Sequence, residues 1–468
     1  MLFNTFQFVI FFGVLLLLYR SLPGSARNPL LLIASILFYS LWIPSYLLLL
    51  AVDLVVNYAL LRAMVRSTRP KPYLVVSIVF TLGLLGCFKY AALFIESAMP
   101  ALQGVFGWTP QVPELFLPLG ISFYSFQIIA LCVDTYRGSI EPVKRFSRYA
   151  LFISFFPQLI AGPILRGYEF LPQLERGGQI SAERTRRGLW LLASGLVKKV
   201  IFADFLLATF VDDVFYIPGV ASAPFHLVAV YSFAFQIYFD FSGYTDMARG
   251  LACLLGFELP LNFMEPYLAR NPSEFWRRWH MTLSRWLQDY LYIPLGGNRH
   301  SRNRTYVNLF LTMLLGGLWH GAAWTFVAWG GLHGIMLMLH RAFGRRSGDV
   351  SAPLRWSDAP RILLLFNCTC LLWIFFRAGS FADAATILRS LFTSSYLVGW
   401  PVMQTGIVAL CMAAHLLERL ARPRLGAFQL ELGQRAWGSA FEGLLAGAIV
   451  GAAIAVSGVG GEFIYFQF

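Results

Sequence analysis

The chain has 468 residues, of which 57% are hydrophobic and only 13% are charged, and its mean hydropathy is +0.62. Because soluble domains carry about 25% charged residues, this composition excludes an ordinary soluble protein and predicts a polytopic membrane protein. The formal net charge of +13 comes from basic residues between the apolar runs, which is typical of cytoplasmic loops. No basic tract is interleaved with aromatic residues, so the charge indicates contact with a lipid bilayer and excludes nucleic acid as a partner.

The N-terminal apolar runs predict membrane helices. Residues 2–19 lack both a preceding basic region and a small-residue cleavage site, so we expect an uncleaved membrane helix rather than a signal peptide. Residues 29–61 form a second run, in which Pro44 should break the helix. A third crossing is predicted over residues 73–94, followed by a connection over residues 95–116 that holds no Lys or Arg.

Loop charges predict the topology of this part of the chain. Lys and Arg are concentrated before residue 73 and after residue 133. Both of these loops are therefore expected in the cytoplasm and the connection over residues 95–116 outside. The same alternation places the N-terminus on the outer side of the membrane.

The apolar stretch over residues 149–165 is interrupted by Pro157, Gly162 and Pro163 and has basic residues on both flanks. Flanks of the same sign indicate that it enters and leaves on the cytoplasmic side. Non-helical backbone at membrane depth is tolerated only where it is buried in protein or lines a cavity. We therefore predict a re-entrant segment, with Gln158 as a candidate substrate-contacting residue.

Two further crossings are predicted over residues 188–211 and 225–257. The second contains Asp240 and Tyr244 within an aromatic stretch, which indicates a polar pocket inside the bundle. Hydrogen bonds from these groups to helix termini or to Arg249 would explain the same residues without a substrate. The sequence leaves both explanations open.

Residues 259–304 form the longest stretch in the middle of the chain without a crossing. Asn271 can cap a helix that has Pro272 at its first position and Glu274 in the first turn, so a helix is predicted over residues 272–291. At 100° per residue its apolar and basic side chains separate, which predicts an amphipathic helix at the cytoplasmic membrane surface. The apolar face holds Trp276, Trp279, His280, Leu283, Trp286, Leu287 and Tyr290, and the polar face holds Arg277, Arg278, Arg285, Gln288 and Asp289.

His280 is the one ionisable side chain on the apolar face of this predicted helix. A lone histidine in such a place is usually a packing residue. A second histidine, His320, follows in an apolar run, so a functional role for His280 stays open beside the packing role.

No Lys, Arg, Asp or Glu occurs between Arg304 and Arg341, and this run predicts a helical hairpin over residues 305–340 with His320 near its turn. An ionisable side chain at membrane depth is a candidate functional residue, and histidine is suited to proton transfer near neutral pH. A neutral imidazole hydrogen-bonded to a neighbouring helix is the alternative. Glycines on both arms permit the two helices to approach closely.

Apolar runs over residues 361–376 and 402–417 predict another pair of helices, and residues 443–459 predict a last helix rich in small residues. Together the runs predict an all-α polytopic membrane protein with about eleven or twelve membrane helices. We expect a single membrane-embedded domain over residues 1–468. The sequence shows no internal repeat of the kind that many transporters carry.

Four motifs, in order along the chain, carry a resemblance to a known family. They are residues 118–127 (PLGISFYSFQ), 155–163 (FFPQLIAGP), 275–280 (FWRRWH) and 319–324 (WHGAAW). Together with the terminal residues 463–468, they resemble the membrane-bound O-acyltransferase family, and most of all its branch of bacterial alginate and cellulose O-acetylation subunits. The resemblance implies a helical bundle with re-entrant segments around a central tunnel. It also implies that His320 is the family's essential histidine and His280 the second histidine of this branch.

The resemblance further implies an O-acetyltransferase in the bacterial inner membrane, with its N-terminus in the periplasm. Acetyl from a cytoplasmic thioester, expected to be acetyl-CoA, would cross the membrane to a periplasmic acetyltransferase subunit and then to an exopolysaccharide, either cellulose or alginate. The complex that synthesises and exports this polymer would be a further partner. No permanently bound cofactor is expected. No metal site or disulfide is expected either, because the six cysteines lie in or beside apolar runs without metal-ligand spacing.

Substrate or donor contacts are expected from side chains beside these motifs and in the cytoplasmic loops. Basic groups there suit the phosphates of coenzyme A, although lipid phosphate would anchor each of them equally well. The candidates are Arg277, Arg278, Trp319, Trp324, Asp240, Tyr244, Gln158 and Asn298.

The residues themselves are compatible with acyl transfer. One positioned imidazole can take the proton of a hydroxyl and return it to a leaving thiolate, which typically contributes about 10²–10⁴-fold in rate. No Gly-x-Ser-x-Gly elbow occurs, which argues against a serine hydrolase. Transfer of D-alanyl or another acyl group to a cell-envelope polymer, and a transporter or flippase with the histidines as proton relay, are the alternatives.

Overall fold

The computed structural model describes residues 3–112, 115–344, 350, 352–393, 399–434 and 440, and scattered positions from 442 to 455; of residues 422–434 only the backbone is described. Over these residues the chain is helical and contains no β-strand. The helix expected over residues 443–459 lies mostly outside the described residues, and the motif over residues 463–468 lies outside them entirely.

The helices form two compact units. The first comprises Met1–Gly188, Leu251–Pro260 and Gly321–Ala323, and the second comprises Leu189–Gly250, Leu261–His320 and Trp324–Phe468. The expectation of a single domain stays a prediction, and each unit is described by itself below.

The helices of the first unit follow the predicted apolar runs. They are α1 (Phe6–Ser21), α2 (Gly24–Ser40), α3 (Pro44–Arg66), α4 (Lys71–Leu85), the π-helical turn η1 (Gly86–Tyr90), α5 (Ala91–Phe106), α6 (Ile121–Tyr136), α7 (Phe146–Ser154), α8 (Phe156–Leu159) and α9 (Gly167–Arg176). The predicted break at Pro44 is confirmed, because α2 ends at Ser40 and Pro44 is the first residue of α3. The predicted interruption of residues 149–165 is also present, between α7 and α8.

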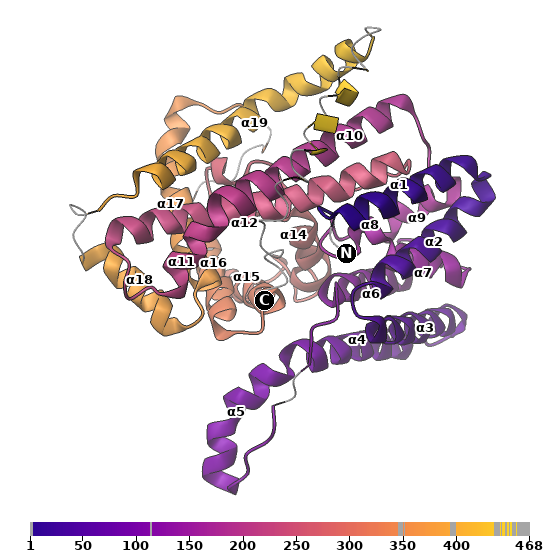
Figure 1. Cartoon of the computed structure of the whole chain (residues 1–468). Coiled ribbons are helices and arrows are strands. Elements are labelled where there is room, and N and C mark those ends of the chain that lie inside the picture. Colours follow the sequence, from indigo (N-terminus) through magenta and orange to yellow (C-terminus); the bar gives the residue numbers. More distant parts are fainter. Residues whose placement is uncertain are drawn as a thin grey trace. The chain divides into compact units, whose positions relative to one another are not determined.

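The expected connection over residues 95–116 is wrong in its first half. Helix α5 continues to Phe106 and ends only at Gly107, whose left-handed conformation (φ 63°) closes the helix. Figure 1 shows α5 extending away from α3 and α4. The lack of Lys and Arg over residues 95–116 indicates on which side of the membrane the connection lies and not whether it is helical, and residues such as Ala, Leu and Gln favour helix there.

Close backbone approach joins two of the sequence motifs within the first unit. Gly120 begins α6 with φ 68°, and a Cβ atom at this residue would lie 2.3 Å from the carbonyl oxygen of Leu159 in α8. Only glycine satisfies both the left-handed backbone and the contact. The motifs at residues 118–127 and 155–163 therefore pack directly against each other.

The second unit begins within α10 (Ala182–Leu196) and is built around one long helix. Its elements are the π-helix η2 (Val197–Ala208), α11 (Thr209–Tyr216), α12 (Ala223–Leu254), the 3-10 turn η3 (Pro266–Leu268), α13 (Pro272–Trp276), α14 (Met281–Leu287), the π-helical turn η4 (Gln288–Tyr292), α15 (Arg302–His320), α16 (Trp324–Phe343), the 3-10 turn η5 (Trp356–Asp358), α17 (Ala359–Arg377), α18 (Phe381–Thr393) and α19 (Val402–Gln434). Helix α12 is buried along most of its length. Helix α16 packs against α15, α17 and α13.

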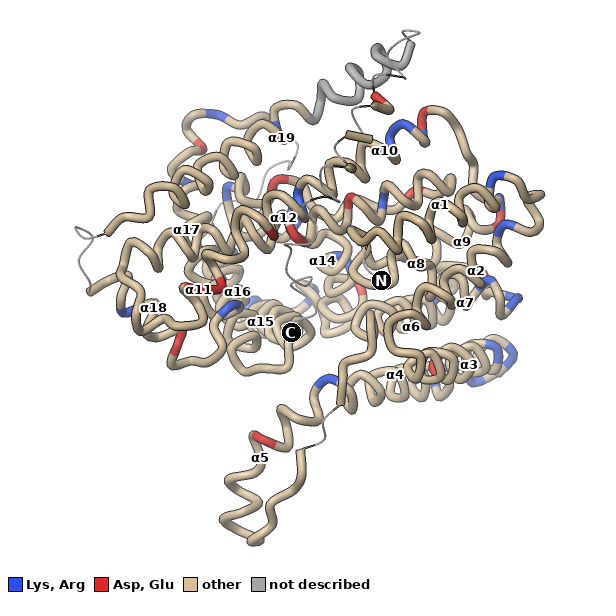
Figure 2. The backbone as a smooth tube through the Cα atoms, viewed as in Figure 1, with Lys and Arg blue, Asp and Glu red and all other residues tan. Residues whose placement is uncertain are grey.

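The described helices include three that are long and apolar enough to cross a bilayer. They are Pro44–Arg66, the continuous stretch Lys71–Phe106, and Trp356–Arg377, with α1 and α6 as shorter apolar helices. Basic residues gather where α3 and α4 meet, and the bodies of these helices are almost free of charge (Figure 2). This distribution fits a multi-pass membrane protein.

Candidate active site

The hairpin of α15 and α16 holds His320 at its end. The predicted hairpin over residues 305–340 is confirmed by helices that run side by side (Figure 1). A Cβ atom on Gly317 would lie 2.3 Å from the carbonyl oxygen of Phe326, and one on Gly330 would lie 2.3 Å from that of Met313. The helices are therefore closer than any side chain at these two positions would allow, and His320 is the last residue of α15.

Aromatic rings enclose the His320 side chain, which is 3% exposed. Its ring centre lies 5.1 Å from Trp329 of α16 and 5.5 Å from Phe376 of α17, in edge-on arrangements of 87° and 69°. Trp319 contributes a third ring at 5.1 Å. The imidazole therefore lies in an apolar enclosure rather than on a lipid-facing surface.

The predicted helix over residues 272–291 is not continuous, which corrects the expectation from periodicity. The predicted cap is present, since the Asn271 side chain accepts a hydrogen bond from the Glu274 backbone at 2.9 Å. Helix α13 ends at Trp276, however, and α14 begins only at Met281. His280 lies between them with φ 41°, a left-handed conformation that is uncommon for a residue with a side chain.

His280 lies beside His320. Their ring centres are 6.4 Å apart. The Nδ1 atom of His280 is 3.2 Å from Oδ1 of Asn262, and its ring packs edge-on against Phe241 of α12 at 4.7 Å. The residue is completely buried. The two histidines that the sequence singled out are thus brought together in one apolar enclosure within the second unit.

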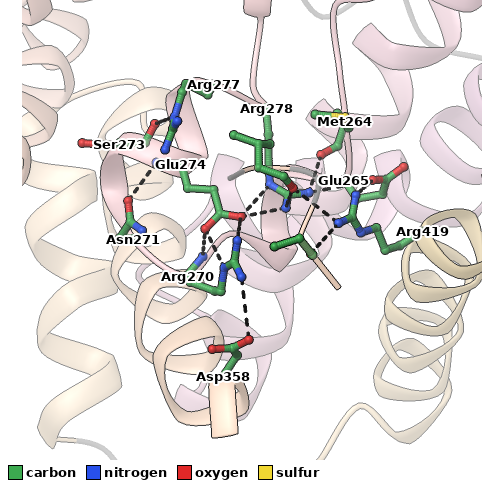
Figure 3. Close-up of polar contacts among 12 residues, drawn as sticks. Met264, Glu265, Arg270, Asn271, Ser273, Glu274, Arg277, Arg278, Asp358 and Arg419 are labelled. Atoms are coloured by element: carbon green, nitrogen blue, oxygen red, sulfur yellow. Dashed lines mark hydrogen bonds and ion pairs between the residues drawn. The ribbon is translucent and has the colours of Figure 1, made fainter. Parts of the chain in front are cut away.

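A buried ion network surrounds Arg278, next to His280. Figure 3 shows Glu274 between Arg270 and Arg278, with hydrogen bonds of 2.9 Å and 2.7 Å from the two guanidinium groups. Burial acts to raise the pKa of Glu274, but the hydrogen bonds from Arg270 and Arg278 outweigh it and hold the pKa below its usual value. Arg278 also donates to the carbonyl oxygens of Met264 and Val350.

The outer part of this network extends to two other helices. Arg270 lies 3.8 Å from Asp358, which precedes α17, and Arg419 of α19 lies 3.8 Å from Glu265. Among these residues three arginines face three carboxylates, with Arg278 fully buried. The expected water-facing position of Arg278 is therefore wrong, and its donors are engaged within the protein rather than presented to a phosphate.

The other donor-binding candidates beside the motifs differ in exposure. Arg277 is exposed and donates to the Ser273 carbonyl oxygen at 3.4 Å, and Asn298 is exposed in the loop before α15. Trp324, at the start of α16, is 48% exposed, whereas Trp319 is buried beside both histidines. Arg277, Asn298 and Trp324 are consequently the accessible members of the predicted set.

Asp240 belongs to a second buried charge cluster. Lys199 of η2 lies 2.6 Å from Asp240 and 2.7 Å from Asp204. One turn along α12, Tyr244 is also buried. Asp240 is thus ion-paired within the protein, with a lysine that the sequence analysis did not connect with it. Two lysines at the boundary of an apolar run were the available signal.

Gln158 belongs to the first unit, where it forms a reciprocal amide pair with Gln127 of α6. The two amide groups exchange hydrogen bonds of 2.8 Å and 3.0 Å. Gln158 also donates to the Ile153 carbonyl oxygen at 3.3 Å. Because these bonds occupy its polar atoms, its contacts are those of a residue that joins α6 to α8.

Sequence reasoning missed two polar residues near the histidines, Asn262 and His333. His333 of α16 is fully buried, stacks on Phe275 at 5.9 Å, and lies 4.7 Å from Trp329. Its position as a further histidine in the same uncharged run was a visible signal. Asn262 had no local signal. Groups of acidic, histidine and cysteine side chains that could hold a metal ion do not occur in the described part of the chain.

Residues 36–375 match the model of the membrane-bound O-acyltransferase family. The chain belongs to this family. The segments at residues 275–280 and 319–324, which carry the two histidines, lie within the matched range.

Curated relatives of this membrane-bound O-acyltransferase act on different polymers. The chain is 41% identical to the probable alginate O-acetylase AlgI of Pseudomonas aeruginosa over 396 residues, which is 83% of this chain and 74% of that protein. It is 39% identical to the peptidoglycan O-acetyltransferase of Helicobacter pylori over 84% of this chain and 80% of that protein. It is 28% identical to the teichoic acid D-alanyltransferase of Streptococcus thermophilus over 55% of this chain and 68% of that protein. The chain is an acyltransferase.

Proposed function

We propose that this acyltransferase takes acetyl from a cytoplasmic thioester, acetyl-CoA, and passes it across the bacterial inner membrane for O-acetylation of an exopolysaccharide. The observation that carries the proposal is the pair of buried imidazoles, His280 and His320, with ring centres 6.4 Å apart. The alginate O-acetylase among the relatives supports alginate as the acceptor, and cellulose is the second candidate from the resemblance of the sequence motifs. A periplasmic acetyltransferase subunit and the machinery of polymer export complete the proposal.

The reaction requires one proton to move twice. His320 accepts the proton of the attacking hydroxyl while the oxygen bonds to the thioester carbonyl carbon. The C–S bond then breaks, and the imidazolium returns the proton to the leaving thiolate. Ester and thiol are the products, with no net uptake or release of protons. Imidazole is suited to both steps because one ring nitrogen can accept a proton and later release it.

The enclosure of His320 supports transfer rather than hydrolysis. Trp319, Trp329 and Phe376 surround the imidazole at 5.1–5.5 Å. A site that excludes water protects a reactive thioester from hydrolysis and strengthens electrostatic interactions within it. We assign to His280 a supporting role beside His320, either as a hydrogen-bonding partner or in proton transfer.

His320→Ala tests the proposal. We expect the variant to reach the membrane in normal amount and to lower polysaccharide acetylation by about 10²-fold or more, the range of a lost general base. His333→Phe is the matched control, because it changes another buried histidine of the same hairpin and keeps the ring packing. Wild-type acetyl content in the His320→Ala strain, measured by NMR of the isolated polymer, would contradict the proposal.

A second acyl group is kept as a candidate because one relative is a teichoic acid D-alanyltransferase. Purified protein in lipid vesicles can be offered either radiolabelled acetyl-CoA or D-alanine bound to a carrier protein. Labelling of an acceptor from acetyl-CoA supports acetyl transfer. Labelling only from the carrier protein would replace it with D-alanyl transfer.

A further inference from the structure

Asn262 lies on a segment that is paired with the backbone around His280. The carbonyl oxygen of Asn262 accepts a hydrogen bond from the Met281 backbone at 2.9 Å, and the Met264 backbone donates to the Arg278 carbonyl oxygen at 2.9 Å. Asn262 and His280 are both fully buried. The two stretches are therefore held in register on either side of His280.

The side chain of Asn262 makes three short contacts through one atom. Its Oδ1 accepts hydrogen bonds from the Thr282 backbone at 3.1 Å and from the Thr282 hydroxyl at 2.9 Å. The same atom lies 3.2 Å from Nδ1 of His280. Two groups of Thr282 and one ring nitrogen of His280 thus meet at a single amide oxygen.

The chemistry of these contacts determines where the hydrogen of the imidazole lies. A backbone N–H can only donate, so the amide atom facing Thr282 must be the oxygen and not the nitrogen. An amide oxygen can only accept, so Nδ1 of His280 must carry a hydrogen to bond with it. In a neutral imidazole the other ring nitrogen, Nε2, then has the lone pair.

We propose that Asn262 is a positioning residue that holds His280 in the Nδ1–H tautomer, so that Nε2 is the basic nitrogen of this ring. The inference rests on the proposed function for its consequence, since a basic Nε2 serves to accept a hydrogen bond or a proton during acyl transfer. The tautomer itself follows from the hydrogen-bond geometry.

The backbone of His280 supports a function beyond packing. His280 and Glu265 are the two non-glycine residues with positive φ in the described part of the chain, at 41° and 38°. Glu265 lies on the stretch that holds Asn262, and His280 lies on the stretch paired with it. Such conformations persist only where surrounding structure holds them, and they are common at functional sites. If Asn262 had only a structural role, it would support the start of α14 through Thr282. It would not need to determine the tautomer of the His280 imidazole.

Nitrogen-15 NMR of histidine-labelled protein in lipid tests the tautomer directly. The ring signals of His280 are assigned by their loss in His280→Gln. We expect a protonated Nδ1 and an unprotonated Nε2 in the wild-type protein at neutral pH. A wild-type spectrum with the hydrogen on Nε2 would overturn the proposal, whatever the variants do.

Three variants then separate positioning from support. Asn262→Leu removes the acceptor, and we expect a mixed or reversed tautomer and a loss of roughly 10²-fold in kcat with little change in KM. Asn262→Asp keeps the acceptor, and its carboxylate should stabilise the imidazolium and move the acid limb of the rate profile to higher pH. Thr282→Val, the matched control, removes one partner of Asn262 and should keep the wild-type tautomer and rate. An unchanged tautomer in Asn262→Leu would overturn the proposal.

Failure of the proposed function would look different. If His280→Ala transfers acetyl normally while the wild-type ring shows the Nδ1–H tautomer, the positioning stands and the role of His280 in transfer is lost. If the wild-type His280 ring carries its hydrogen on Nε2 while His320→Ala is inactive, the proposed acyl transfer stands and the positioning role of Asn262 is refuted.

Discussion

The two histidines of the site are held by different physical means. His320 ends a regular helix, and the hairpin that carries it closes through glycine contacts and aromatic rings. His280 lies in left-handed backbone between two short helices, beside a buried network of arginines and carboxylates. Close packing positions the first residue, and hydrogen bonds and ion pairs position the second.

This difference predicts different sensitivities. A hairpin held by packing is sensitive to a change of side-chain volume at its contact points, because interiors have little free space. A segment held by a balanced ion network tolerates small changes of volume but not the loss of one charge, because the remaining partner stays buried without compensation. The variants below test this contrast through the free energy of unfolding in detergent.

Arg278→Met should have the largest effect. It leaves the carboxylates of Glu274 and Glu265 buried beside one arginine fewer, and removing one partner of a buried ion pair costs about 3–5 kcal/mol. Arg277→Ala is the matched control, because the neighbouring Arg277 is exposed and surface changes usually stay within about 0.5 kcal/mol. Equal free energies of unfolding for the two variants would show that the ion network does not stabilise the segment around His280.

Gly317→Val should have an intermediate effect by forcing α15 and α16 apart. A Cβ atom there meets the Phe326 carbonyl oxygen at 2.3 Å, and overpacking typically costs about 1–3 kcal/mol. Gly331→Ala is the control in the same hairpin, since its Cβ would make only ordinary contacts from 3.4 Å outward. We expect the alanine variant to unfold at the wild-type temperature or above it, and a loss as large as that of Gly317→Val would contradict the packing argument.

Asn308→Ala should have the smallest effect and tests whether the two regions are coupled. Asn308 of α15 is buried and donates to the Gly297 carbonyl oxygen, in the loop that follows η4, at 3.0 Å. Its loss leaves a buried acceptor unsatisfied, which costs about 1–3 kcal/mol, and we expect the lower end of this range because the loop is partly exposed. Thr312→Val removes only a hydroxyl bond within α15 and serves as control. Equal free energies of unfolding for Asn308→Ala and Thr312→Val would show that the hydrogen bond from Asn308 to Gly297 does not couple the α15–α16 hairpin to the loop after η4.

Several features could be predicted from the sequence because they depend on neighbours in the chain. The break between α2 and α3 follows from Pro44, which lacks a backbone N–H and is favoured at the first position of a helix, and an uncharged run that contains paired glycines predicts a hairpin with His320 near its turn. The cap at Asn271 is equally local. The motifs at residues 275–280 and 319–324 also identify both histidines from the sequence alone.

Other features were decided only by the tertiary structure. A continuous period of 3.6 residues predicted one helix over residues 272–291, because a left-handed histidine leaves no mark in the periodicity. Charged residues are mostly exposed, so the burial of Arg278 could not be expected without Glu265, Asp358 and Arg419, which approach from distant parts of the chain.

The sequence by itself therefore determined the helical membrane class, the hairpin and the identity of the two histidines. Their proximity, the pairing of Lys199 with Asp240, and the contact of Asn262 with the His280 ring were decided by folding. The physical reason is the separation along the chain over which each interaction acts. Helix propensity, capping and proline breaks act between residues a few positions apart, whereas hydrogen bonds and ion pairs between segments depend on how the whole unit packs.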